Sequence, residues 1–128
     1  MAPPPGKLPL SPPLAARELN GEQLLEELYE LREGQVRTAQ LAACARDLRA
    51  QRDSDPPRLK KQLVALAEGR YAPQPALAQL LRSWAPRVNV PGDVAALTSH
   101  FERLALTSAL LTALHYGRAR LPGGGGRG

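Results

Sequence analysis

Aromatic and β-branched residues are scarce in this sequence, and their scarcity argues against a β-sheet. Aromatic residues make up 4% of the chain, and most of its 43% hydrophobic residues are leucine or alanine. Leucine and alanine favour helices, whereas strands are rich in valine, isoleucine and aromatic residues. The composition therefore predicts a single all-α domain. It also predicts a thin core, because alanine buries little area, and such a core would gain stability from a partner.

Cysteine and histidine are scarce too, which argues against disulfides, metal sites and a reactive thiol. Cys44 is the one cysteine, so no internal disulfide can form, and we predict an intracellular protein of the cytoplasm or nucleus. His100 and His115 stand fifteen residues apart, so we expect surface or cap histidines rather than metal ligands. Cys44, between Ala43 and Ala45, is predicted to be a passive thiol. We predict no metal and no cofactor.

The sequence also lacks a pattern typical of an active site. The carboxylates between Glu22 and Glu33 are predicted to lie on a solvated helix face, where nothing desolvates them for acid–base catalysis. The four consecutive glycines at 123–126 follow no predicted strand and precede no predicted helix, as a phosphate-binding loop requires. We therefore predict that the protein is not an enzyme.

Proline and glycine are concentrated near the two ends, and they set the predicted domain bounds. Six prolines lie within residues 1–13, and this stretch has no apolar run of the kind found in a secretory signal. We expect residues 1–18 to be a disordered proline-rich lead and residues 19–117 to form the helical domain. Residues 118–128 are expected to be a disordered tail of glycine and arginine.

The first long helix is predicted from Asn20 to Arg52, with Asn20 as its N-cap and Gln23 completing a capping-box spacing. Its apolar positions repeat as in a coiled coil, with Gly34 and Gln35 as a weak middle. The sequence leaves open whether the helix is continuous through Gly34. Five glutamates lie in its first half and four arginines, from Arg37 to Arg52, in its second half, which suits the helix dipole. The charged face is interpreted as the solvated side of a bundle helix in preference to a self-association surface.

Two shorter helices are predicted next. Asp55 can cap the second helix, Pro56 suits its first position, and Gly69 is expected to end it. The third helix is predicted from Pro75 to Ala85, with Pro86 as its stop. Short links between four helices predict a small antiparallel bundle.

The last helix is predicted from Val94 to Tyr116, with Asp93 as its cap and Gly117 at its end. It is apolar on nearly every side and must therefore be covered by other helices or by a partner. A buried core helix is the preferred interpretation, and a helix half-buried at a subunit interface is the alternative. Its threonines and His100 interrupt the apolar run, so we predict no membrane span.

The leading functional hypothesis is a protein–protein interaction module, a small helical subunit or adaptor of a larger intracellular complex. The predicted contact residues are the leucines of the first and last helices, which exceed what a thin core needs. They are Leu24, Leu28, Leu31, Leu41, Leu48, Leu106, Leu110 and Leu114. A separate possibility is a homodimer whose function lies in the geometry of the dimer.

The alternative hypothesis is a nucleic-acid-associated accessory protein. The chain carries a net charge of +5, which permits contact with phosphates. The residues that would contact phosphates are Arg58, Lys60, Lys61, Arg70, Arg87, Arg118 and Arg120. Three of them lie near the start of the second helix, where the helix dipole disfavours cations.

Overall fold

The computed structural model describes residues 19–120, with side chains through His115. Within this range every regular element is a helix, which confirms the all-α prediction. Five α-helices and one short 3₁₀ helix follow each other: α2 (Gly21–Glu33), α3 (Thr38–Arg49), α4 (Pro56–Glu68), α5 (Pro75–Trp84), η2 (Ala85–Arg87) and α6 (Pro91–Arg120). The predicted lead of residues 1–18 and the tail beyond Arg120 lie outside the described residues.

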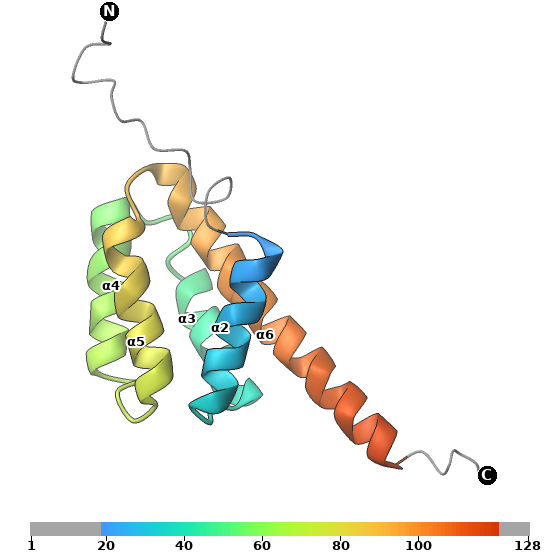
Figure 1. The fold of residues 1–128 in the computed structure, drawn as a ribbon. Helices are drawn as coiled ribbons and strands as arrows, with labels where there is room; N and C mark the ends of the chain where they lie inside the picture. The colour runs from blue at the N-terminus through green and yellow to red at the C-terminus, as the bar shows by residue number, and fades with distance from the viewer. Residues whose placement is uncertain (1–18, 121–128) are drawn as a thin grey trace, which may run out of the picture.

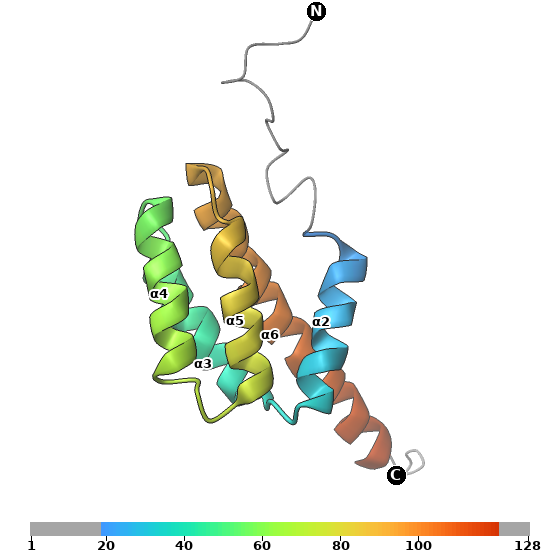
Figure 2. The ribbon, with the colours of Figure 1, turned by 60° about the vertical axis from the view of Figure 1, so that its left-hand side comes forward.

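Helices α2 to α5 stand side by side, and each runs in the opposite direction to the one before it (Figures 1 and 2). Helix α4 packs against α5, and α6 packs mainly along α3. The later half of α6 diverges from the other helices in Figure 1, and its last turns extend past their ends in Figure 2. The molecule therefore has a packed body and one projecting helix.

The first predicted helix is in fact two helices, so the described chain has five α-helices rather than four. Helix α2 ends at Glu33, and α3 begins at Thr38 after a tight turn. Gln35 has a φ of 62°, a conformation that cannot continue a right-handed helix. The amide of Val36 then bonds the carbonyl of Leu31, and the Val36 side chain is buried. The coiled-coil repeat is thus folded back on itself at Gly34.

Two of the predicted N-caps are present. The Asn20 side chain accepts a hydrogen bond from the amide of Gln23 at 2.8 Å, and Asp55 accepts one from the amide of Arg58 at 2.9 Å. The Gln23 side chain does not complete the predicted capping box, because its amide group donates to Glu27 at 2.6 Å. The caps confirm where α2 and α4 begin.

The bounds of the last helix were predicted wrongly. Helix α6 begins at Pro91, because proline suits the first helical position. Asp93 lies inside the first turn, where its carboxylate accepts from the amides of Asn89 at 2.9 Å and Val90 at 3.1 Å. The helix also continues past Gly117 to Arg120. The end of the third helix was predicted to within one residue, because α5 ends at Trp84 and Pro86 lies in the separate short helix η2.

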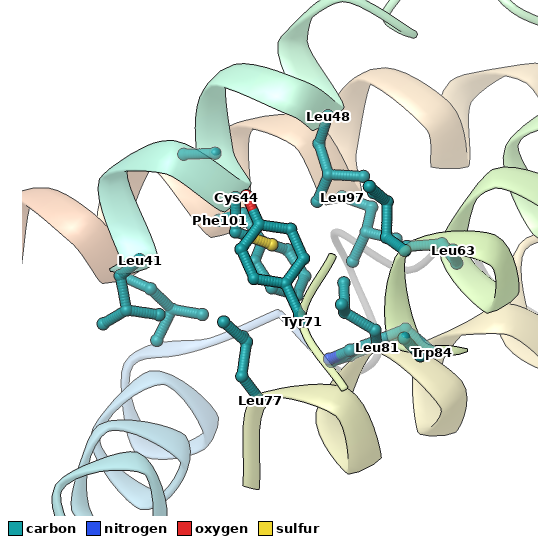
Figure 3. Packing of buried hydrophobic residues seen from close by; sticks show 14 of the residues in the cluster. Leu41, Cys44, Leu48, Leu63, Tyr71, Leu77, Leu81, Trp84, Leu97 and Phe101 are labelled. Carbon is teal, nitrogen blue, oxygen red and sulfur yellow. The ribbon is translucent and has the colours of Figure 1, made fainter. Parts of the chain in front are cut away.

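The core lies between α2, α3, α4, α5 and the first half of α6, and Figure 3 shows its centre. Trp84 and Phe101 are its bulkiest residues and are fully buried. Leucines fill the space around them, and the Cys44 side chain points into the same cluster (Figure 3). The hydroxyl of Tyr71 donates to Asp47 at 2.6 Å and ties the α4–α5 connection to α3. A leucine core with few aromatics agrees with the composition.

Cys44 is expected to react slowly with alkylating reagents in the folded protein. Burial raises the pKa of its thiol to about 12, and the carboxylate of Asp47 adds to the shift. Because the thiolate is the reactive form, the alkylation rate at pH 8 should be about 100-fold or more below that of the unfolded chain. Iodoacetamide labelling with and without guanidinium, followed by mass spectrometry, measures this ratio. Equal rates in the two conditions would show that Cys44 is not in the core.

Candidate functional site

The projecting part of α6, which we call the distal half (residues 106–115), is the most exposed apolar segment of the described chain. Upstream on the same helix, Leu97 and Leu104 are fully buried against the body. Past Leu104 the exposed fractions rise to 63% for Leu106, 62% for Leu110 and 65% for Leu114. Exposed leucines on a free helix end are a common mark of a protein-binding surface.

Leu106, Leu110 and Leu114 form one row, which we call the leucine ridge. They stand four residues apart, and residues at this spacing lie along one side of an α-helix. No ionisable residue occurs between Arg103 and His115. The ridge is therefore an uncharged strip on a protein whose net charge is +5.

A groove opens on another side of the distal half, between α6 and the turn that joins α2 to α3. Its volume is about 490 Å³. Leu28, Leu31, Val36, Leu41 and Leu111 supply its apolar lining, and Arg32, Arg37, Thr38, Ala39, Ser108, Thr112 and His115 complete it. Neither arginine forms an ion pair with an acidic side chain of the described residues. The distal half thus has an uncharged ridge and a groove with a basic rim.

Hydroxyl groups fix the distal half to the start of α3. The Thr38 and Ser108 hydroxyl oxygens lie 2.6 Å apart, and the Thr112 hydroxyl lies 3.4 Å from Thr38. One turn earlier on α6, Glu102 accepts a hydrogen bond from the guanidinium of Arg49 at 2.6 Å. These contacts set the angle at which α6 leaves the body. They are polar and partly exposed, so each adds little stability.

A buried polar cluster lies where α2, α5 and α6 meet. Glu27 is 3% exposed and His100 is 1% exposed, and their side chains are joined at 2.7 Å. A carboxylate can only accept, so the Nε2–H of His100 donates in this bond. The second oxygen of Glu27 accepts from the indole N–H of Trp84 at 3.2 Å and from Gln23 at 2.6 Å.

This cluster corrects two sequence predictions. His100 is a core residue rather than a surface or cap histidine, and Glu27 is not on a solvated face. A 3.6-residue period could have found both: Leu24, Glu27, Leu28 and Leu31 share one side of α2, and Leu97, His100, Phe101 and Leu104 share one side of α6. The cluster leaves no acceptor oxygen of Glu27 unpaired, so its role is structural.

The structure divides the predicted contact leucines into two groups. Leu28, Leu31, Leu41 and Leu48 are buried, because the turn at Gly34 folds the predicted seam into the core. Leu24 is half-buried, and these five do not form a continuous surface. All three leucines of the leucine ridge are exposed. The exposed large hydrophobic residues of α2 are instead Leu25, at 59%, and Tyr29, at 66%. The heptad pattern did not predict their exposure.

The predicted phosphate-contacting residues are spread over the two ends of α4, the short helix η2 and the last turns of α6. Arg58, Lys60 and Lys61 lie in its first two turns, and Arg70 lies past its end. Arg70 is engaged by Asp47 at 3.1 Å and lies over the Tyr71 ring. Arg87 lies over the ring of Trp84, 4.8 Å from its centroid. Arg118 and Arg120 belong to the last turns of α6, whose side chains are outside the described set.

Other kinds of site find no support in the described part of the chain. Among its side chains, no three histidine, cysteine or acidic residues gather as metal ligands would. None of its helices has both the length and the apolar character that a membrane crossing needs. Comparisons with protein-family models, curated proteins and solved structures give no match.

Proposed function

We propose that this protein is a non-enzymatic interaction module, a small helical subunit or adaptor of an intracellular complex, and that the distal half of α6 is its binding surface. The observation that carries the proposal is the exposure of Leu106, Leu110 and Leu114 at 62–65% on a projecting helix. Fully burying a leucine side chain contributes about 1.5–3 kcal/mol. Three solvent-exposed leucines on one side of a helix therefore favour association with another apolar surface.

The adjoining groove supports the same proposal. It places apolar lining beside the ridge, on a segment of α6 that contacts the body along one side only. A partner that contacts the ridge and the groove would cover the distal half on two sides. A helix with apolar residues on several sides needs such cover. Rim arginines such as Arg32 and Arg37 then suit carboxylates at the edge of the partner.

Affinity capture from a native extract tests this function. The double variant Leu106→Glu/Leu114→Glu should lose specifically captured proteins by about 10-fold or more, because four carboxylate oxygens then occupy an apolar contact. Val64→Glu, a matched change at an exposed apolar position of α4, should capture as the unaltered protein does. Circular dichroism checks that all three proteins are equally helical.

Two outcomes would contradict the proposal. If the double variant stays folded and captures the same proteins in the same amounts, the leucine ridge is not the binding surface. If Val64→Glu loses as much as the double variant, a different face of the molecule carries the binding.

A further inference from the structure

We propose that the partner of the leucine ridge is the leucine ridge of a second copy of this chain, in an antiparallel two-fold dimer centred on Leu110. This inference rests on the proposed function only in using the same surface. It adds the identity of the partner and the symmetry of the contact. It requires that the ridge be complementary to itself, because a two-fold interface pairs one patch with the same patch.

Self-pairing is favoured by the absence of charge from the ridge. Two copies of a chain with a net charge of +5 repel each other over most of their surface. Residues 104–114 contain no ionisable group, so this strip is where two copies can meet without bringing like charges together. The three members of the ridge are all leucine, so any pairing of them is an apolar contact.

The register of the ridge also suits an antiparallel pair. With Leu110 on the two-fold axis, Leu106 of one copy lies opposite Leu114 of the other. The antiparallel arrangement therefore places a leucine opposite a leucine at all three positions of the ridge.

The shape of the molecule leaves room for this contact. The later half of α6 diverges from the body in Figure 1, and the three leucines of the ridge are exposed, so a second helix can approach the ridge. Rows of side chains at four-residue spacing interdigitate best when two helices cross at about −50°. That crossing angle would carry the two bodies away from each other, on opposite sides of the contact.

The area available predicts a weak dimer in exchange with the monomer. Each leucine of the ridge offers roughly 100 Å², and with exposed Ala109 and Ala113 one copy would bury about 500 Å². The sum for two copies, about 1,000 Å², is at the lower limit of specific protein interfaces. We expect a dissociation constant on the order of tens of micromolar.

Disulfide trapping tests the two-fold axis directly. A residue on the axis meets itself, so Leu110→Cys should give a covalent dimer on mild oxidation, whereas Val64→Cys should stay monomeric. Native Cys44 does not interfere, because its side chain is fully buried. A mixture of Leu106→Cys and Leu114→Cys should cross-link mainly between the two variants if the helices are antiparallel. Cross-linking of each variant mainly with itself would overturn the antiparallel arrangement.

Charge exchange at Leu110 gives a second, reversible test by sedimentation velocity. Leu110→Glu and Leu110→Lys should each raise the dissociation constant about 100-fold or more, because like charges then meet on the axis. An equimolar mixture of the two should dimerise again, and Val64→Glu should dimerise as the unaltered chain does. A chain that stays monomeric at several hundred micromolar, or a mixture that stays monomeric, would overturn the dimer.

The two proposals fail in different ways. If the chain is monomeric at high concentration and captures another protein through the ridge, the proposed function stands and the homodimer is wrong. If the chain dimerises through Leu110 and captures nothing else, the homodimer stands and the adaptor function is wrong.

Discussion

Replacing Glu27 with alanine is expected to lower the free energy of unfolding by about 3–5 kcal/mol, because two buried donors lose their acceptor and each unpaired donor costs about 1–3 kcal/mol. The change leaves the His100 ring and the indole N–H of Trp84 without their acceptor, at positions that are 1% and 0% exposed. Urea unfolding followed by circular dichroism measures the loss.

The matched control is Glu26→Ala, an exposed glutamate one residue earlier on α2, which should change stability by less than about 0.5 kcal/mol. The double variant Glu27→Leu/His100→Leu removes both polar partners and should be more stable than Glu27→Ala, because apolar side chains can replace a buried pair at little cost. If Glu27→Ala unfolds at the same urea concentration as Glu26→Ala, the buried pair contributes nothing.

Where the sequence carries local signals, the prediction of the fold succeeded. Helix α4 is the clearest case, because Asp55, Pro56 and Gly69 define its ends through contacts within a few residues. Capping by a side chain, the fixed φ of proline and the freedom of glycine act on the adjacent backbone alone. Such elements need no knowledge of what packs against them.

The sequence was insufficient to predict features of the fold that depend on tertiary contacts. Leu28, Leu41 and Leu48 fit a coiled-coil seam, and the same spacing also fits two shorter helices that share one core. The burial of Glu27 and His100 depends on their pairing across α2 and α6, 73 residues apart in the chain. Polar residues at inward positions therefore gave the false expectation of solvated side chains.

Only part of the candidate site was predicted, because the rest of it depends on tertiary contacts. Leu106, Leu110 and Leu114 were predicted as contact residues, and their helical spacing places them on a different side of α6 from the buried Leu97 and Leu104. Their exposure could not be derived from spacing, because it depends on α6 diverging from the neighbouring helices (Figure 1). The groove was missed, because it needs the turn at Gly34 to bring Val36 and Leu111 to one place.

Gly34, whose effect on the first helix the sequence left open, is the subject of the second large expected effect. Gly34→Ala should lower the free energy of unfolding by about 2–3 kcal/mol, because an added Cβ would overlap the Cβ of Ala76 on α5. The backbone itself would accept alanine, since the φ of Gly34 is −83°. The cost therefore comes from the close approach of α5 and not from conformation. Gly21→Ala, with nothing within 4 Å of the added Cβ, is the matched control and should not destabilise the protein.

A second substitution can restore the space that Gly34→Ala fills. Ala76→Gly removes the atom that the new methyl group meets, at the cost of about 0.5–1 kcal/mol for a glycine in the first turn of α5. The double variant Gly34→Ala/Ala76→Gly should therefore be more stable than Gly34→Ala alone, which a double-mutant cycle in urea measures. If the two changes are simply additive, the contact between Gly34 and α5 does not hold the turn, and the separation of α2 from α3 rests on Gln35 and Val36 alone.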